Sequence, residues 1–259
     1  MTDVSISRLA ETPLSGSVPR FEIPGWRDRF GVVAGITARG AVGSEPFDLG
    51  LWTAESVGKV MTRWRAFRSA EAGFSGFAMA YQVHGSRVAW HERVNGWSIL
   101  EGLDGHLTST PGLMLLVTVA DCIPIYLIDR NGHAVGLLHA GWRGTAAGIL
   151  GRGVEGLAEA TGSSPADIIM HCGVGICGSC YEVGAEVMEA CGLLSRPPGP
   201  WHLDLRALLT DQAVKLGVGE VSVSSYCSAH DGASFFSHRR SGGSDGRMVA
   251  YIGLPVNAT

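Results

Sequence analysis

The stretch "IYLIDRNGHAVGLLHAGWRG", residues 125–144, decides how this chain folds. Two apolar runs flank a polar segment at 129–132, and this pattern predicts a β-hairpin. The second run ends in His139, which is followed directly by Ala-Gly-Trp-Arg-Gly. A histidine at the end of an apolar strand is either a hydrogen-bonded core residue or part of a site, so the register of the hairpin decides what it faces.

The possible registers of this hairpin bring Cys122 and His139 together. A turn at Arg130-Asn131, or a loop over 129–132, places Cys122 directly opposite His139. A turn at Asn131-Gly132, the strong hairpin dipeptide, places the two residues diagonally. Side chains alternate along a strand, so both registers leave the thiol and the imidazole on one face. Only an odd loop or a bulge would separate them.

The rest of the chain alternates predicted strands and helices without a linker. Apolar runs predict strands at 31–37, 77–85, 113–119, 123–129, 133–140, 167–175, 220–227 and 247–254. Helices are expected at 55–70, 145–160, 182–191 and 204–216. A hairpin inside such an alternation favours a mixed sheet. We therefore expect a loose N-terminal leader over 1–20 and one α/β domain over 21–259, built on a mixed β-sheet with flanking helices.

Composition excludes several classes of function. The net charge of −4 gives no electrostatic case for a nucleic-acid or membrane surface. The stretch at 1–20 lacks the apolar core expected of a signal peptide, and no apolar run reaches membrane-spanning length. A chain of this length does not need disulfides for its stability, so we expect its six cysteines to be free thiols. We expect a cytoplasmic protein that acts on a small molecule, and the sequence does not indicate its oligomeric state.

The juxtaposition of Cys122 and His139 admits three interpretations. A thiolate and an imidazole suit zinc, and a third ligand, for which His84 in "YQVHGS" is the best candidate, would leave a position for water. Alternatively, the imidazole activates Cys122 as a nucleophile. The third interpretation is a buried thiol beside a hydrogen-bonded histidine. The residues alone leave all three open.

A second group of cysteines lies in "HCGVGICGSC". Cys172, Cys177 and Cys180 have the C-x4-C-x2-C spacing of plant-type iron–sulfur proteins, with Cys191 or Cys227 needed as a fourth ligand. Cys177 and Cys180 also form a C-x-x-C pair, the spacing of redox motifs. Nothing nearby supports either function, so we favour a tight glycine loop with packed thiols.

Several motifs together resemble a known family. "QVHG", "ADCIPI", "HAGWRG", "YEVG" and "FFSHRRSGGSDGRM" occur in the order found in the YfiH family, from about residue 30 to the C-terminus. Members of this family are described as multicopper polyphenol oxidases with a laccase domain and as zinc-dependent purine nucleoside phosphorylases. The resemblance implies a single α/β domain on a mixed sheet. It also implies that His84, Cys122 and His139 are the metal ligands and the catalytic residues.

The activity implied by the resemblance is phosphorolysis of adenosine, inosine and methylthioadenosine, together with deamination of adenosine, with zinc as the metal. Guanidinium groups bind phosphate through paired hydrogen bonds, so arginines in matching motifs are candidate substrate or phosphate ligands. The candidates are Arg39 in "ITARG", Arg143 in "GWRG", and His238, Arg239 and Arg240 in the glycine-rich segment. Composition alone would make the last segment a surface turn.

Some residues are assigned less definitely. Asp104 in "LDGHLT" matches a family position, but no mechanism requires it. Asp48 in "FDLG", the loop "GVGICG" (173–178) and Ser228 after Cys227 depart from the family pattern, and we expect these positions near the substrate. His230, like the other remaining histidines, is interpreted as a loop or strand-end residue.

Three other functions compete with the zinc nucleoside enzyme. A copper-dependent polyphenol oxidase of the laccase type has less support from the residues. Copper oxidases of this kind need histidines in His-x-His pairs, and the chain has no such pair. A metal-free Cys–His hydrolase would use Cys122 on an amide or a cell-wall precursor. A non-catalytic protein would bind a small molecule or zinc in the same pocket. Copper is thus the alternative metal to zinc.

Overall fold

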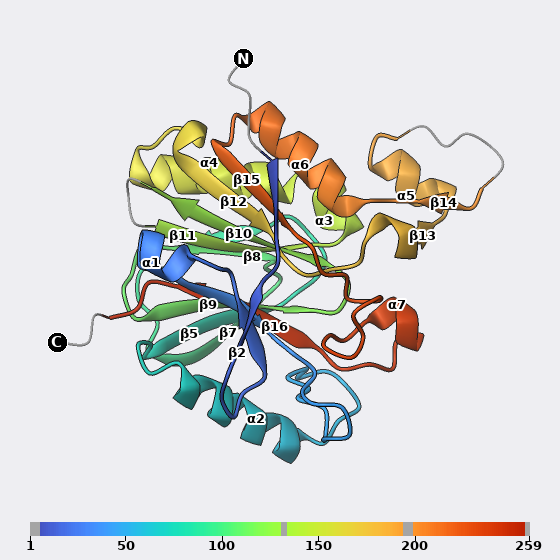
Figure 1. Ribbon diagram of the computed structural model, residues 1–259. Coiled ribbons are helices and arrows are strands. Elements are labelled where there is room, and N and C mark those ends of the chain that lie inside the picture. Colours follow the sequence, from blue (N-terminus) through green and yellow to red (C-terminus); the bar gives the residue numbers. More distant parts are fainter. Residues whose placement is uncertain (1–5, 131–133, 194–198, 257–259) are drawn as a thin grey trace.

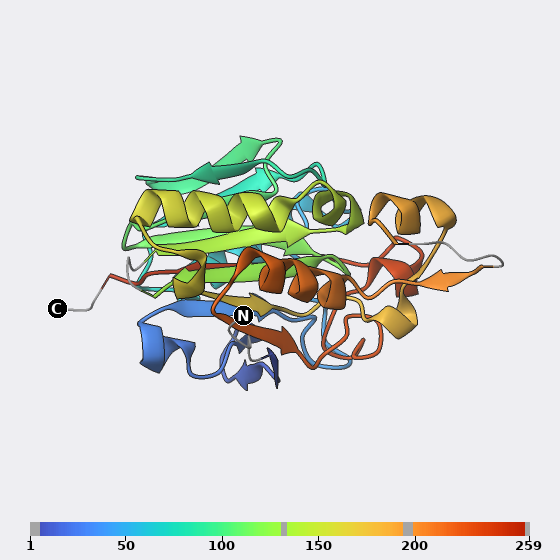
Figure 2. The ribbon, with the colours of Figure 1, turned by 90° about the horizontal axis from the view of Figure 1, so that it is seen from above.

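Two β-sheets lie face to face across the main hydrophobic core, and helices cover both outer faces (Figures 1 and 2). The computed structural model describes residues 6–130, 134–193 and 199–256. Within these residues each of the two sheets has seven strands. The architecture is therefore a mixed α/β fold in four layers, helix on sheet on sheet on helix.

The first sheet contains the hairpin. Its strands in spatial order are β1 (Ile6–Leu9), β15 (Glu220–Ser224), β12 (Ile168–Cys172), β10 (Ile123–Asp129), β11 (Ala134–Ala140), β8 (Gly105–Thr108) and β6 (Val88–Trp90). β1, β15 and β12 run parallel to one another, whereas β10 is antiparallel to both β12 and β11. All seven residues of β10 and of β11 are buried, because the second sheet covers one face and helices cover the other.

The second sheet packs against the first. Its strands in spatial order are β2 (Thr12–Leu14), β3 (Arg20–Glu22), β4 (Val33–Thr37), β16 (Met248–Gly253), β9 (Leu113–Val119), β5 (Gly76–Tyr81) and β7 (Gly96–Glu101). A hydrogen bond of 2.8 Å from the hydroxyl of Tyr126 on β10 to the carbonyl of Gly35 on β4 joins the two sheets through the core. A separate two-stranded sheet pairs β13 (Glu182–Val183) with β14 (Trp201–His202).

Three long helices complete the layers. α4 (Ile149–Thr161) and α6 (Leu205–Leu216) lie side by side over the first sheet, as Figure 2 shows from above. α2 (Val57–Ala70) buries Trp64 and Phe67 against the second sheet. Short helices fill the connections: α1 (Trp26–Phe30), α3 (Trp142–Ala146), η1 (Pro165–Asp167), η2 (Gly178–Cys180), α5 (Ala185–Ala190) and α7 (His238–Ser241). None of the helices in the described part of the chain is long and apolar enough to cross a membrane.

The predicted mixed α/β class is confirmed, and the strands divide between two sheets. Periodicity identifies a strand but not the sheet to which it belongs. The predicted helix over 145–160 is two helices, α3 and α4, because the chain changes direction at Gly148, whose φ of 77° suits glycine. The predicted strand over 77–85 ends at Tyr81, and the remainder forms a loop. The start of the predicted helix over 182–191 is the strand β13.

The expectation of a loose leader over 1–20 is wrong for residues 6–20, the part of this segment that the structure describes. β1 pairs with β15 at one edge of the first sheet, and β2 pairs with β3 at one edge of the second. Val18 is completely buried. These strands are short and mostly exposed, so backbone hydrogen bonds rather than an apolar pattern hold them, and composition does not reveal them.

Candidate metal centre and active site

The hairpin has the diagonal register. Pro124 on β10 pairs with His139 on β11, so Cys122, two residues earlier, lies diagonally from His139. This is the register predicted for a turn at Asn131-Gly132; residues 131–133 themselves lie outside the described residues. The thiol and the imidazole therefore share one face at the open end of the hairpin, as expected from the alternation of side chains.

His84 reaches the pair from the second sheet. It follows β5 in a loop where its own φ is 58°, a conformation that non-glycine residues adopt rarely. The side chain of Gln82 holds the start of this loop against β9: its amide donates to the carbonyl of Thr118 at 3.0 Å, and its carbonyl accepts the backbone N–H of Thr118 at 2.7 Å. The "QVHG" motif thus combines an anchoring glutamine with the histidine that it positions.

A buried carboxylate holds the ring of His139 and the backbone of the loop that carries His84. Asp104, between β7 and β8, is 0% exposed and accepts a hydrogen bond from Nδ1 of His139 at 2.9 Å. The same carboxylate accepts the backbone N–H groups of Val83, His84 and Gly85 at 3.3, 2.9 and 2.7 Å. Because Asp104 occupies Nδ1 of His139, the other ring nitrogen is left to face Cys122. The sequence showed Asp104 only as a position shared with the family.

The Cys122–His139 pair is strongly polarised. Burial alone would raise the pKa of the Cys122 thiol, but the charge of His139 and hydrogen bonds with both histidines outweigh burial and lower it to about 6. Burial opposes the charged form of His139 as well, yet the Cys122 thiolate and the hydrogen bond to Asp104 raise the pKa of the imidazole to about 9. In the metal-free site these interactions favour a thiolate beside an imidazolium.

Asp121, directly before Cys122, occupies a second unusual backbone conformation, with a φ of 90°. Its carboxylate accepts the hydroxyl of Ser228 and the backbone N–H of Arg239, each at 2.6 Å. The backbone around Cys122 is therefore held by segments from distant parts of the chain. Among the described non-glycine residues only His84 and Asp121 have positive φ, and such backbone strain is characteristic of functional sites.

The three side chains open onto a cavity of about 570 Å³. Aromatic rings form part of its wall: Trp52 and Tyr81 meet edge to face with ring centroids 5.0 Å apart, and both are about half exposed. Trp142 and Tyr181 also line it. An apolar, aromatic wall beside a few polar groups is typical of a small-molecule site.

Basic side chains line the same cavity, but not all those expected from the sequence. Arg143, His238 and Arg239 are among the lining residues, and Arg247, which the sequence did not single out, joins them. The guanidinium of Arg143 stacks on Trp142 at 4.2 Å from the ring centroid.

Arg39 and Arg240 do not line the cavity. Arg39 forms a salt bridge with Asp245 and stacks on Phe236. The guanidinium of Arg240 donates to the backbone carbonyls of Ala229 and Phe235, each at 3.2 Å. Both arginines instead tie the glycine-rich segment to the body of the protein.

Asp48 also has a structural role. Its buried carboxylate accepts the backbone N–H groups of Gly50 and Arg247 at 2.7 and 2.8 Å and the hydroxyl of Thr53 at 2.9 Å. Gly50, Thr53 and Arg247 line the cavity, whereas Asp48 does not. Asp48 therefore shapes the wall from behind.

The iron–sulfur spacing is not realised in three dimensions. Cys172 is buried on β12, where burial raises the pKa of its thiol to about 12, and it does not join Cys177 and Cys180. Cys191, after α5, is likewise outside their group. The loop does not simply pack its thiols, however, because Cys177 and Cys180 meet Cys227 and His230. His230 is thus more than the loop residue that the sequence suggested.

The residues at the cavity fit a metal ion. One ligand atom each from His84, Cys122 and His139 lies within 4.8 Å of the others, so all three can reach one centre. Two imidazoles and a thiolate are zinc ligands, and three protein ligands leave one position open. The carboxylate of Asp104 behind His139 is the usual support for a metal-binding histidine.

Known proteins resemble this chain over most of its length. The model of the family described as multi-copper polyphenol oxidoreductase laccase matches residues 33–255. A purine nucleoside phosphorylase of Deinococcus radiodurans is 41% identical over 203 residues, which cover 74% of this chain and 76% of the relative. A protein of an unknown prokaryote named adenosine deaminase RL5 is 37% identical over 193 residues, covering 67% and 73%.

A solved structure supports the fold as well. The crystal structure of YlmD from Geobacillus stearothermophilus superposes with a TM-score of 0.81 at 29% identity, covering 94% of this chain and 98% of that one. The protein is named a purine nucleoside phosphorylase. The present chain belongs to the multi-copper polyphenol oxidoreductase laccase family, an enzyme family that includes YlmD and YfiH proteins.

Proposed function

We propose that this protein is a zinc-dependent enzyme that cleaves purine nucleosides with phosphate and also deaminates adenosine. The observation that carries the proposal is the convergence of His84, Cys122 and His139 in a cavity with aromatic and guanidinium walls. The names of the relatives, purine nucleoside phosphorylase and adenosine deaminase, support the same substrate class.

The chain's own residues divide into two tasks. Trp52 and Tyr81 offer aromatic surface for the purine, whereas Arg143 and Arg239 offer charged donors for phosphate. In phosphorolysis a phosphate oxygen bonds to C1′ of the ribose as the bond from C1′ to the purine nitrogen breaks. The electron pair leaves with the purine, which takes up a proton.

His84, Cys122 and His139 would hold the metal, with Asp104 fixing the tautomer of His139. Zinc, when bound, supplies Lewis-acid polarisation of a substrate oxygen or of a water molecule. The cavity walls then position the nucleoside and phosphate, which accounts for much of the barrier lowering that an enzyme can achieve.

The deciding experiment follows adenosine by chromatography with purified protein, with and without phosphate and before and after chelation. Adenine and ribose 1-phosphate that appear only with phosphate, and inosine that forms in either case, are the expected products. Chelation and Cys122→Ala should abolish both. Cys191→Ser is the control and should keep full activity, because Cys191 belongs to neither of the two groups of neighbouring histidines and cysteines.

Other outcomes select the alternative functions. Oxygen uptake with a phenolic substrate and bound copper would identify the oxidase. Turnover of an amide that survives chelation but not alkylation of Cys122 would identify a Cys–His hydrolase, for which the thiolate–imidazolium pair of the metal-free site is suited. No turnover of adenosine in any condition contradicts the proposal for this nucleoside.

A separate experiment tests whether Arg143 binds phosphate and not the nucleoside. Arg143→Ala should raise the KM for phosphate by about 10–100-fold, the value of one hydrogen bond to a charged group, and leave the KM for adenosine nearly unchanged. Arg152→Ala, which removes an exposed arginine of α4, is the matched control. An equal rise in both KM values would contradict a phosphate role for Arg143.

A further inference from the structure

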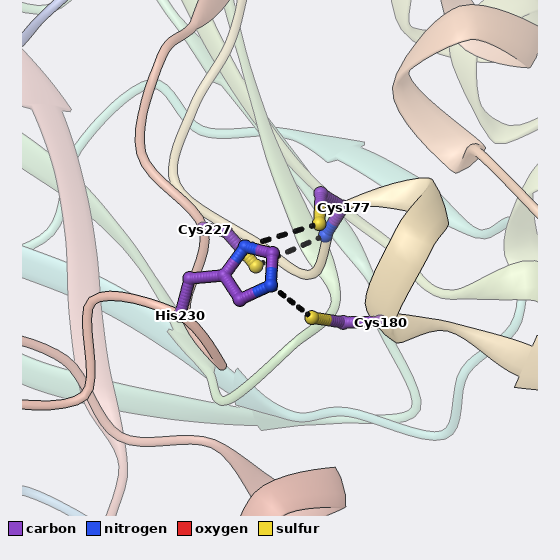
Figure 3. A group of neighbouring side chains, drawn as sticks. All are labelled: Cys177, Cys180, Cys227 and His230. Carbon is purple, nitrogen blue, oxygen red and sulfur yellow. Dashed lines mark hydrogen bonds between the residues drawn. The ribbon is translucent and has the colours of Figure 1, made fainter.

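A second group of metal-ligating side chains lies outside the catalytic cavity. We call it the cysteine–histidine cluster, and it consists of Cys177, Cys180, Cys227 and His230 (Figure 3). Sγ of Cys180 lies 3.1 Å from Nε2 of His230, and Sγ of Cys177 lies 3.7 Å from Nδ1 of the same ring. None of the four residues lines the catalytic cavity. The cluster is therefore a separate feature.

The sheet topology brings the cluster together. β12 and β15 are neighbouring parallel strands, so the loops that follow them leave the same edge of the first sheet. Cys177 and Cys180 lie in the loop after β12, and Cys227 lies in the loop after β15. A bridge between Gly175 and Cys227, and a bond of 3.3 Å from the N–H of Cys177 to Sγ of Cys227, hold the loops in contact.

The spacing and the donor set are those of structural zinc sites. The chain presents C-x2-C from one loop and C-x2-H from the other, a pair of short ligand knuckles. Three thiolates and one imidazole provide four protein ligands, which closes a tetrahedral site. We propose that the cysteine–histidine cluster binds a structural zinc ion.

The size of the cluster favours one ion over an iron–sulfur centre. Zinc–sulfur bonds of about 2.3 Å in a tetrahedron place the sulfurs about 3.8 Å apart. One ligand atom from each of the four residues lies within 4.8 Å of all the others, so only small side-chain movements are needed. A centre with two irons needs its ligands spread over two metal positions, which this compact arrangement does not provide.

The zinc would fasten the two loops on which the catalytic site depends. Ile176 and Tyr181, on either side of the C-x2-C segment, line the catalytic cavity. Ser228, next to Cys227, donates to Asp121, which precedes Cys122. Metal at the cluster thus holds part of the cavity wall and the backbone before Cys122. This proposal does not depend on the proposed function.

Metal content is the direct test, and the Cys122→Ser background isolates the cluster from the catalytic site. We expect this variant to purify with one equivalent of zinc per chain, and Cys122→Ser/Cys180→Ser to purify with none. Cys122→Ser/Cys191→Ser is the matched control and should retain the zinc. Absence of zinc from the Cys122→Ser protein overturns the proposal. Bound iron with visible absorption also overturns it. A free-thiol count that is two below the number of cysteines, which would indicate a disulfide, overturns it as well.

Two measurements cover the case in which Cys180→Ser does not fold. In the native wild-type protein, Cys177 and Cys180 should resist alkylation until a chelator is added, whereas Cys191 should be labelled in both conditions. Labelling of Cys177 and Cys180 without chelator contradicts the proposal.

Thermal unfolding supplies the second measurement. Chelation should lower the Tm of Cys122→Ser by about 5–10 °C, if zinc is present at about 100 times its Kd. It should leave Cys122→Ser/His230→Ala unchanged, because His230 is exposed and its loss removes a ligand without opening the core. An equal Tm decrease in both proteins contradicts a zinc ion at the cluster.

Discussion

Replacing Asp104 with asparagine tests how the two halves of the candidate metal site are held together. The two carboxylate oxygens of Asp104 together accept four N–H groups, from Val83, His84, Gly85 and His139. An asparagine has one acceptor oxygen, and its amide nitrogen would face N–H groups on the other side. The substitution also removes the negative charge behind His139. It changes no atom of the three candidate ligands.

The structure indicates the size of the effect. If the amide oxygen stays toward His84 and His139, the N–H groups of Val83 and Gly85 lose their acceptor. A fully buried, unpaired donor costs about 1–3 kcal/mol, but these two N–H groups are only partly buried. We therefore expect Asp104→Asn to lower the free energy of unfolding by about 2–3 kcal/mol, near the lower end of that range for two donors. Loss of the carboxylate that supports a metal-binding histidine typically costs 10–100-fold in metal affinity, or about 1.4–2.7 kcal/mol.

The assay is reactivation of the metal-free enzyme in buffers of defined free zinc, with adenosine phosphorolysis as the signal. The zinc midpoint of Asp104→Asn should lie about 10–100-fold above that of the wild type. Asp129→Asn is the matched control, because Asp129 is also a buried carboxylate but lies at the other end of the hairpin from Cys122. A variant that loses stability yet keeps the wild-type zinc midpoint would refute the positioning role of Asp104.

Two further predictions concern pH and packing. Burial, only partly offset by Arg20, raises the pKa of Glu71 from 4.5 to about 7. The folded chain therefore holds a proton that the unfolded chain has lost, so the free energy of unfolding should fall by about 3 kcal/mol as the pH rises from 4.5 to about 7. Urea unfolding across this range should show the decrease, and Glu71→Gln should remove it. If the free energy of unfolding depends on pH equally in the wild type and in Glu71→Gln, Glu71 is not the group responsible. A Cβ at Gly141 would lie 3.1 Å from Sγ of Cys122 and 3.2 Å from a ring carbon of His84. Gly141→Ala should therefore displace two ligands and reduce turnover at least about tenfold, a loss typical of disturbed metal sites. Gly151→Ala on α4, with no atom within 4 Å of the new Cβ, should leave kcat unchanged and serves as the control; equal activities would show that the site tolerates the crowding.

The hairpin was readable from sequence because its determinants are local. Cys122 and His139 are separated by a single turn, and the period of two along a strand places them on one face in either register. The mixed α/β class followed from the same local pattern. Local patterns failed at β1 and β2, because exposed edge strands depend on partners far away in the chain.

The assembly of the site depended on the tertiary structure. The packing of two sheets brings His84 to the hairpin. One buried carboxylate, Asp104, accepts hydrogen bonds from the backbone of His84 and from the ring of His139. The sequence could propose His84 as a third donor but could not measure its distance from Cys122. The arginines show the same limit. Arg143 and Arg39 were equal candidates from the sequence, but Arg143 lines the cavity whereas Arg39 forms a salt bridge with Asp245.

The cysteines show most clearly where sequence reasoning stops. The C-x4-C-x2-C spacing groups Cys172 with Cys177 and Cys180 only as a possibility, because spacing measures distance along the chain and not distance in space. Strand β12 buries Cys172 in the first sheet, and the parallel pairing of β12 with β15 brings in Cys227 and His230 instead. The sequence by itself therefore determined the hairpin, the fold class and the kinds of ligand available. Which ligands share a centre was decided by strand pairing between residues about fifty positions apart, and no local pattern records that pairing.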